Sequence, residues 1–435
     1  MAEDKRQEEK EFSFVKEKIK HQPVYQSKLF RKAVFQIVMA VVCGVIACFV
    51  FVMVHPWMEQ KFGREEKTEI TLPEEEEPVP EETQVPEETT DTQDTQDVQP
   101  TDPIVITQKK ELELSDYEAL YRKMRAVVSE SERSLVTVTA ENSDTDWFNQ
   151  TYESQNQLSG LIVGDNSVEL LILTSYSEIA SADRLEVTFA DNSSKDAALK
   201  NYDPVTDLAV ISVNLADISQ GTMDYIKMAE LGSSTSLHPG EPVIAAGSPA
   251  GVPGSMLIGN LAVTGYKVNV IDGEYTLLIT DMRKASSSSG VLLNLDGKVI
   301  GLIQDAYTST GSKDALTAYA ITGMKSIIEH LSNSKDIVYL GITGADVTQE
   351  TASEQNMPLG VYVTGVELNS PAMNAGIQAG DIVTKINGQE IYKLADIQDI
   401  LLKFSREQVI QIEVMRRGKE EYQEIACSVA LGQLK

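Results

Sequence analysis

An uninterrupted apolar run near the N-terminus constrains this chain most. Residues Ala33–Val54 carry no charge over 22 positions, and Gln36 is the one strongly polar side chain among them. A helix of that length crosses the ~30 Å hydrocarbon core of a bilayer. A cleaved signal peptide has a shorter apolar core that lies nearer the N-terminus, whereas 32 residues precede this run. The sequence therefore predicts a transmembrane helix over residues 33–54.

Basic residues indicate how that helix is oriented. Six Lys or Arg side chains lie within residues 16–32, whereas the three that follow the run, up to Lys67, are mixed with Glu. This excess favours a cytoplasmic tail over residues 1–32 and a single-pass cell-membrane protein whose bulk is extracytoplasmic. Cys427 is the one cysteine beyond the run, so no intramolecular disulfide is expected on that side of the membrane.

Acidic composition defines the next segment. Residues 65–104 hold 15 acidic side chains, six prolines and one lysine, which accounts for about half of the formal net charge of −29. Such a stretch buries no core, so we expect an extended linker over residues 55–114. The net charge also argues against nucleic-acid binding. The three cysteines and four histidines form no ligand cluster, and no nucleotide motif is found, so neither a metal nor a cofactor is expected.

Residues 115–334 are predicted to be mainly β. Helical periodicity covers Asp116–Glu132, and a second short helix over 321–331 closes the region. Between them lie nine apolar runs separated by Gly, Asp, Asn, Ser or Pro, without the strand–helix alternation of an α/β protein. The runs are 134–141, 158–164, 168–174, 184–190, 207–213, 242–248, 275–281, 290–295 and 298–303. This pattern is typical of an all-β barrel or sandwich.

Residues 335–435 form a second, smaller unit. The pattern predicts strands at 338–342 and 409–418 and a helix over 394–404. Asn387-Gly388 is a hairpin-turn dipeptide. Short strands and helices in about 100 residues indicate a small α+β domain.

Several phrases resemble the landmarks of the HtrA-type (DegP/DegQ-like) trypsin-like serine proteases. They are SGLIVG, LILTSYSEI, YDPVTDLAVISV, PVIAAGSPAG and NLDGKVIGLI in the first unit, and YLGI with GVYVTGVELNSPAMNAGIQAGDIVTKINGQEI in the second. The resemblance covers residues ~115–432. It implies a trypsin-like double β-barrel followed by a PDZ domain, and it further implies trimers formed through the protease domains.

The resemblance also implies that the catalytic base is replaced. Hydroxyl attack on an amide needs a Ser, a general base and an acid that orients the base. The family's base falls at Ser177, whose hydroxyl is no useful base near neutral pH. The family's acid falls at Asp207, although Asp203 and Asp207 also suit the cap of a turn.

The nucleophile phrase is altered as well. Residues 286–289 are four serines, and the loop is one residue shorter than the family pattern. Counting back from NLDG places the nucleophile at Ser288, and counting forward from Thr280 places it at Ser289. The missing glycine is expected to disturb the oxyanion hole. Lys284 is an alternative base for Ser288, but it needs burial to act as one.

The PDZ-like unit keeps its binding features. Peptide C-termini add a strand to the sheet edge of such domains, with the carboxylate held by backbone N–H groups. The resemblance places that loop at Tyr339-Leu340-Gly341-Ile342. On the following helix, Ile397 and Leu401 lie on one face. They are candidates for the peptide groove or, equally, for the core.

These observations favour a membrane-anchored, HtrA-like pseudoprotease that binds peptide C-termini or unfolded envelope proteins. The first alternative is an active serine endopeptidase of cell-envelope quality control that uses an unconventional base. The second is a structural tether in which neither groove binds a ligand.

Overall fold

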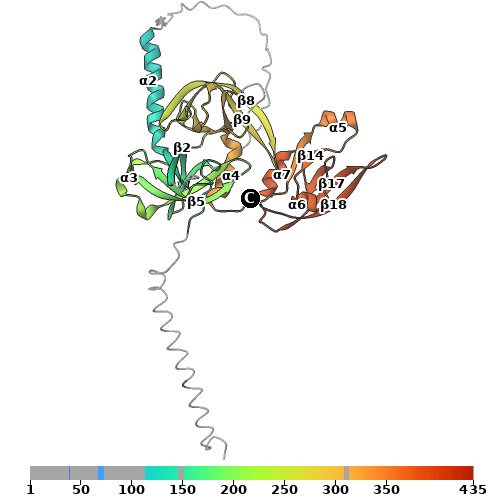
Figure 1. Ribbon diagram of the computed structural model, residues 1–435. Helices are drawn as coiled ribbons and strands as arrows, with labels where there is room; N and C mark the ends of the chain where they lie inside the picture. Colours follow the sequence, from blue (N-terminus) through green and yellow to red (C-terminus); the bar gives the residue numbers. More distant parts are fainter. Residues whose placement is uncertain (1–38, 40–66, 73–112, 146–150, 308–312, 435) are drawn as a thin grey trace, which may run out of the picture. The chain divides into compact units, whose positions relative to one another are not determined.

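The computed structural model describes residues 39, 67–72, 113–145, 151–307 and 313–434 (Figure 1). The predicted tail and transmembrane helix, Met39 apart, and most of the linker lie outside these residues. Within the described part of the chain, no helix combines the length and apolarity needed to cross a membrane. The chain divides into two compact units, residues 1–66 and 67–435, and the second contains all the elements below.

A helix and a closed six-stranded barrel come first. Helix α2 (Leu114–Ser131) confirms the predicted helix, and its Met124 and Val128 are buried against the barrels. A 3₁₀ turn leads into the barrel, whose strand order is β1-β2-β3-β6-β5-β4. The strands are β1 (Leu135–Thr145), β2 (Thr151–Asp165), β3 (Glu169–Ser175), β4 (Arg184–Thr188), β5 (Ser194–Asp203) and β6 (Leu208–Asn214). A 3₁₀ turn (Leu215–Asp217) and helix α3 (Gln220–Tyr225) follow.

The second barrel is also closed, in the order β10-β11-β12-β9-β8-β7. Its strands are β7 (Pro242–Ser248), β8 (Ser255–Val270), β9 (Gly273–Arg283), β10 (Ser289–Leu293), β11 (Val299–Gln304) and β12 (Ala315–Ala320). A 3₁₀ turn (Ile321–Met324) and helix α4 (Lys325–Ser332) close the region, as the sequence predicts. The mainly β prediction is thus confirmed as two barrels, with β5, β8 and β12 not foreseen.

The C-terminal domain is one sheet with three short helices. The sheet order is β13-β14-β15-β17-β18, so β13 lies at an edge, and β16 pairs with β15. The strands are β13 (Ile342–Val347), β14 (Gly360–Val366), β15 (Ile382–Ile386), β16 (Gln389–Glu390), β17 (Val409–Arg417) and β18 (Tyr422–Ala430). The helices are α5 (Gln349–Gln355), α6 (Pro371–Asn374) and α7 (Leu394–Leu401). Asn387 and Gly388 have φ of 48° and 79°, as the predicted hairpin turn requires.

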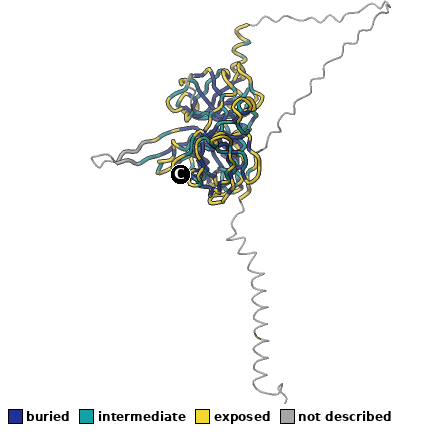
Figure 2. Tube along the Cα trace, turned by 90° about the vertical axis from the view of Figure 1, so that its right-hand side faces the viewer, coloured by how far each residue is buried: buried dark blue, intermediate teal, exposed yellow. Residues whose placement is uncertain are grey.

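Separate clusters of apolar side chains fill the barrels and the sheet domain. Figure 2 shows the buried residues of these parts in dark blue along the chain trace. Another cluster joins the two barrels, with Val210, Leu277 and Tyr319 fully buried in it. Because strands from both barrels contribute to this shared cluster, the barrels are held in a fixed relation. The side chains that line the cleft between the barrels are therefore held at fixed relative positions.

Residues 67–72 pack against the first barrel. Thr68 N donates to Asn166 O at 3.1 Å, and Ile70 exchanges two hydrogen bonds with the Asn333 side chain at 2.8 and 2.7 Å. Burial of Glu169 disfavours its charge, but hydrogen bonds from Lys200, Lys67 and Asn166 outweigh burial and lower its pKa to about 2. Glu169 therefore anchors this segment as an ionised carboxylate.

Candidate active-site cleft and peptide groove

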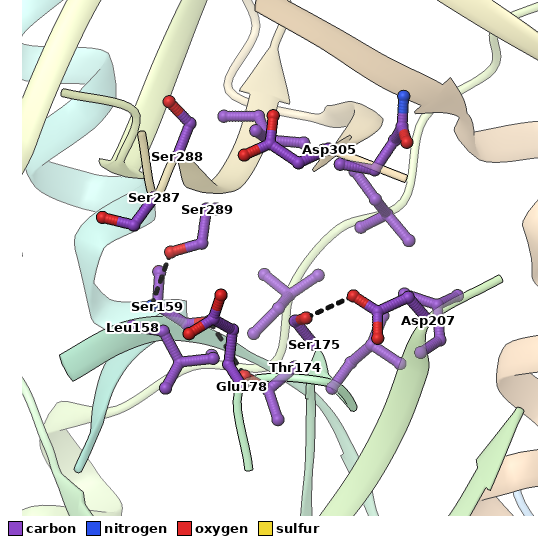
Figure 3. Close-up of a pocket in the computed structure, with 18 of the residues that line it drawn as sticks. Leu158, Ser159, Thr174, Ser175, Glu178, Asp207, Ser287, Ser288, Ser289 and Asp305 are labelled. Carbon is purple, nitrogen blue, oxygen red and sulfur yellow. Dashed lines mark hydrogen bonds between the residues drawn. The ribbon is translucent and has the colours of Figure 1, made fainter. Parts of the chain in front are cut away.

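A cleft lies between the barrels. Its walls come from the middle of β2, the end of β3, the turn before β6, the serine loop before β10 and the end of β11 (Figure 3). It gathers the residues singled out from the sequence as degenerate triad positions: Ser177, Asp207, Ser288 and Ser289. The barrel interface thus assembles a protease-like site whose chemistry depends on which groups face one another.

The turn before β6 presents its two acids differently. Asp203 is buried and accepts hydrogen bonds from Val205 N at 3.1 Å and Thr206 Oγ1 at 2.7 Å. Burial raises the pKa of Asp203 despite those hydrogen bonds. Asp203 therefore caps the turn, as one of the two sequence interpretations holds, and Asp207 (φ 59°) is the acid that faces the cleft.

Asp207 binds hydroxyl and amide groups. Its carboxylate accepts from Ser177 N at 2.6 Å, from Ser177 Oγ at 3.0 Å and from Ser175 Oγ at 2.5 Å (Figure 3). An orienting acid is therefore present and engaged, but the group that it orients is a serine hydroxyl. A hydroxyl donates to the carboxylate and takes up no proton near neutral pH.

The histidines within the described residues lie elsewhere. His238 is exposed and its ring nitrogen pairs with Glu241 at 3.2 Å. His330, at the end of α4, has ring nitrogens within 2.9 Å of Ser326 O and 2.8 Å of Leu402 O. His330 thus joins α4 to the C-terminal domain, and neither imidazole is available to the cleft.

Two neighbouring serines of the loop have different surroundings. Ser288 is buried; its Oγ accepts from Ala285 N at 2.8 Å and donates to Pro249 O at 2.8 Å. Ser289 Oγ instead accepts from Ser159 N at 3.0 Å and points into the cleft, whereas Ser288 points away from it (Figure 3). Ser288 therefore closes the turn, and Ser289 is the better placed candidate nucleophile.

The other candidate bases are engaged too. Lys284 Nζ pairs with Asp305 at 3.1 Å, which holds its ammonium against a carboxylate and away from Ser288. Glu178 is exposed and accepts a hydrogen bond from Asn156. The described residues that line the cleft include no lysine and no histidine that could act as a base for Ser289.

The predicted carboxylate loop sits at the start of the C-terminal sheet. Tyr339 pairs with Gly432 through backbone hydrogen bonds of 2.9 and 3.0 Å. The next three N–H groups, of Leu340, Gly341 and Ile342, converge on one carboxylate, that of Asp272. No sequence pattern indicated this partner, since Asp272-Gly273 reads only as a hairpin turn.

Helix α7 lies beside that loop. Ile397 is fully buried in the core of the sheet domain, which is the core alternative for this residue. Leu401 is also buried there, but it additionally lines a cavity beneath the loop together with Gln398 and Leu402. Of the two helix residues named from the sequence, Leu401 is thus the one next to the candidate groove.

Comparisons with known proteins agree with this geometry. Residues 158–302 match the trypsin-like peptidase domain family, and residues 338–426 match the PDZ domain family. The chain therefore contains a trypsin-like peptidase domain followed by a PDZ domain. This confirms the resemblance inferred from the sequence for both the barrels and the PDZ domain.

Several curated relatives are bacterial proteins named as proteases. The chain is 32% identical over 280 residues to a protein named serine protease Do-like HtrB of Bacillus subtilis, which covers 60% of each chain. It is 27% identical over 330 residues to serine protease Do-like HtrA of Lactococcus lactis, with 70% of this chain and 79% of the relative covered. A probable periplasmic serine endoprotease DegP-like of Marinomonas is 29% identical, with 60% and 55% covered. The chain thus spans 55–60% of the length of two of these three relatives.

Solved structures show the same fold. The HtrA-type protease AlgW with a decapeptide matches with a TM-score of 0.53 at 22% identity, covering 72% of this chain and 99% of that one. The same protease with a tripeptide gives a TM-score of 0.51 at 24% identity, with 72% and 97% covered.

Proposed function

We propose that this HtrA-type protein is a binding protein without peptidase activity, which captures peptide C-termini or unfolded proteins through its PDZ domain. One observation carries the proposal: Asp207 orients the Ser177 hydroxyl where a protease needs an imidazole. Loss of one triad member costs on the order of 10⁴–10⁶ in rate. The buried hydrogen bonds of Ser288 add a second defect, because they hold the serine loop in a closed turn.

We further propose where the protein acts. The predicted transmembrane helix over residues 33–54 and the basic residues before it support a single-pass anchor with the bulk outside the membrane. One relative carries the word periplasmic in its name, which supports an extracytoplasmic site. Assembly into trimers rests on the resemblance to the HtrA-type proteases.

The alternative is an active serine endopeptidase with an unconventional base. One specific observation favours it: Ser289 Oγ faces the cleft, which the Asp207 carboxylate also lines (Figure 3). The three relatives described above are also named as proteases. The two functions differ in a single property, serine-dependent hydrolysis.

Capture of free C-termini tests the proposed binding function. The full-length chain in detergent is titrated with a pool of fluorescein-labelled decapeptides with free carboxyl termini, and with the same pool amidated. We expect polarisation to rise with the first pool alone, because the loop recognises a carboxylate. Equal binding of both pools, or binding of neither, contradicts the proposal.

A matched pair of glycine variants locates that binding. Gly341 (φ 90°) has no room for a Cβ, which would clash with Ser370, whereas Gly376 (φ 85°) has open space. Both substitutions by Ala carry similar backbone strain. Gly341→Ala is expected to weaken peptide binding by at least about tenfold, as loss of one buried recognition contact does, and Gly376→Ala to leave binding unchanged.

A further inference from the structure

The hairpin that joins β8 and β9 brings an acidic residue from the second barrel to the PDZ domain. Asp272 lies at its turn with φ of 59°, a left-handed conformation that Asp tolerates better than most residues. Its side chain belongs to the protease-like domain, yet it is buried and 8% exposed. A buried carboxylate far from the cleft needs partners, and the PDZ domain supplies them.

The partners are the N–H groups of the predicted carboxylate loop. Asp272 Oδ2 accepts from Leu340 N at 2.7 Å, both oxygens accept from Gly341 N at 2.8 Å, and Oδ1 accepts from Ile342 N at 2.9 Å. These are the groups that a PDZ domain offers to the terminal carboxylate of a peptide. An internal carboxylate therefore stands where an external one would bind.

The hairpin also contacts the edge strand, through one backbone N–H group and one side-chain amide. Asp272 N donates to Ile342 O at 2.8 Å, and Asn269 Nδ2 donates to Gly344 O at 2.8 Å. Ile342 and Gly344 belong to the edge strand β13, two residues apart, and their carbonyl groups are those that an added strand would pair with. The hairpin thus occupies both the carboxylate loop and the start of the strand-addition edge.

The opposite side of the groove is closed by α7. A Cβ added to Gly273 would lie 2.7 Å from Gln398 Oε1, so the hairpin leaves no space against this helix. The His330 ring to Leu402 O contact, at 2.8 Å, forms a second link between the domains beside α7. A peptide terminus has no free path to the loop N–H groups while the hairpin is in place.

The contact also carries a cost that makes it reversible. Burial raises the pKa of Asp272 to about 6, and the charge of Glu367 adds to the rise, although the loop N–H groups oppose it. Near neutral pH the carboxylate is therefore held ionised in a site that disfavours its charge. A docked hairpin with this penalty is suited to displacement by a competing carboxylate.

We propose that Asp272 is an internal ligand of the PDZ carboxylate loop, which closes the peptide groove until a peptide C-terminus displaces it. The inference rests on the proposed binding function and adds its regulation. The apparent affinity for a peptide then equals the intrinsic affinity of the open groove multiplied by the fraction of molecules whose hairpin is undocked. Displacement also releases the PDZ domain from the β8–β9 hairpin. Peptide binding to the PDZ domain therefore changes a contact made by the second barrel.

Two readouts on the full-length chain test the proposal. The first is hydrogen exchange of the amides at residues 340–342, which reports the hairpin contact without any peptide. The second is polarisation with the decapeptide pool that has free carboxyl termini. The variants are Asp272→Ala, the isosteric Asp272→Asn, and Glu274→Gln as a control on the same hairpin, where Glu274 pairs with Lys267 and not with the loop.

Removal of the internal ligand is expected to expose the groove. Asp272→Ala should speed exchange of the loop amides and tighten peptide binding by at least about tenfold, as removal of a competing closed state does. Asp272→Asn should show a smaller change in the same direction, and Glu274→Gln none. This pattern supports the proposal. If Asp272→Ala does not fold as the wild type does, the faster exchange and tighter binding of Asp272→Asn alone support it.

Three results would overturn it in distinguishable ways. Unchanged exchange in both Asp272 variants shows that the carboxylate does not hold the loop. Faster exchange with equal peptide affinity shows that the hairpin does not compete, while the proposed binding function stands. Faster exchange with no peptide bound by any variant removes the binding function itself, and with it the regulation.

Discussion

Ser177→His is expected to give the cleft weak serine protease activity. The carboxylate of Asp207 already accepts from the backbone and hydroxyl groups of residue 177, so it is placed to orient an imidazole there. A positioned general base contributes about 10²–10⁴ in rate. We expect cleavage of unfolded casein to rise by about 10² over the wild type, below a complete triad because the serine loop still lacks its glycine.

Companion variants identify the groups responsible for that gain. In the Ser177→His background, Ser289→Ala should abolish cleavage, because Ser289 faces the cleft. Asp207→Asn should remove most of the gain. Ser177→Ala should be as inactive as the wild type. Cleavage that survives Ser289→Ala but is lost in Ser288→Ala would reverse the nucleophile assignment, and no gain at all would make the serine loop the dominant defect.

Asp381→Ala is expected to destabilise the PDZ domain strongly. The Asp381 side chain is 1% exposed; it accepts from Arg416 Nε at 2.6 Å, from an Arg416 terminal nitrogen at 2.7 Å and from Gln378 N at 2.9 Å. The hydrogen bonds that Arg416 donates to Asp381 raise the pKa of Arg416. Asp381→Ala leaves Gln378 N and the Arg416 guanidinium, which is 31% exposed, without their acceptor, and this costs about 1–3 kcal/mol of unfolding free energy.

Urea unfolding, together with hydrogen exchange of the β17 amides, measures the loss of unfolding free energy in Asp381→Ala. The matched control is Lys385→Ala, which breaks an ion pair of 3.0 Å with Glu413 on the same sheet, where the Lys385 side chain is 39% exposed. The loss of unfolding free energy in Lys385→Ala should be far smaller, because solvent screens an exposed ion pair. Similar midpoint shifts in both variants would show that burial does not set the strength of the Asp381 pair.

Parts of the fold could be predicted because local pattern and burial agree. Strand β3 is apolar and buried over nearly all of its length, and its run was recognised in the sequence. In strand β5, every residue before Asp203 is exposed or half-buried. Its sequence therefore lacks the alternation of apolar and polar residues by which a strand is recognised. The hairpin of β8 and β9 is likewise exposed over much of β8.

The candidate site divides in the same way. The replaced base at Ser177 and the retained Asp207 follow from motif position, and the structure brings both into one cleft. The choice between Ser288 and Ser289 depends on the path of one turn, which counting along the chain does not determine. Asp272 meets the PDZ loop about 70 residues further along the chain, and no local pattern encodes a contact at that separation.

Labelling of the wild-type, full-length chain by an activated fluorophosphonate tests the central claim most directly, with casein cleavage measured in parallel. The probe reacts with a serine whose hydroxyl is activated by a base. The wild type should show no label and no cleavage beyond a Ser289→Ala control, while it still binds peptides with free C-termini. Labelling of Ser289, together with cleavage that Ser289→Ala abolishes, would contradict the account and make the protein an active endopeptidase.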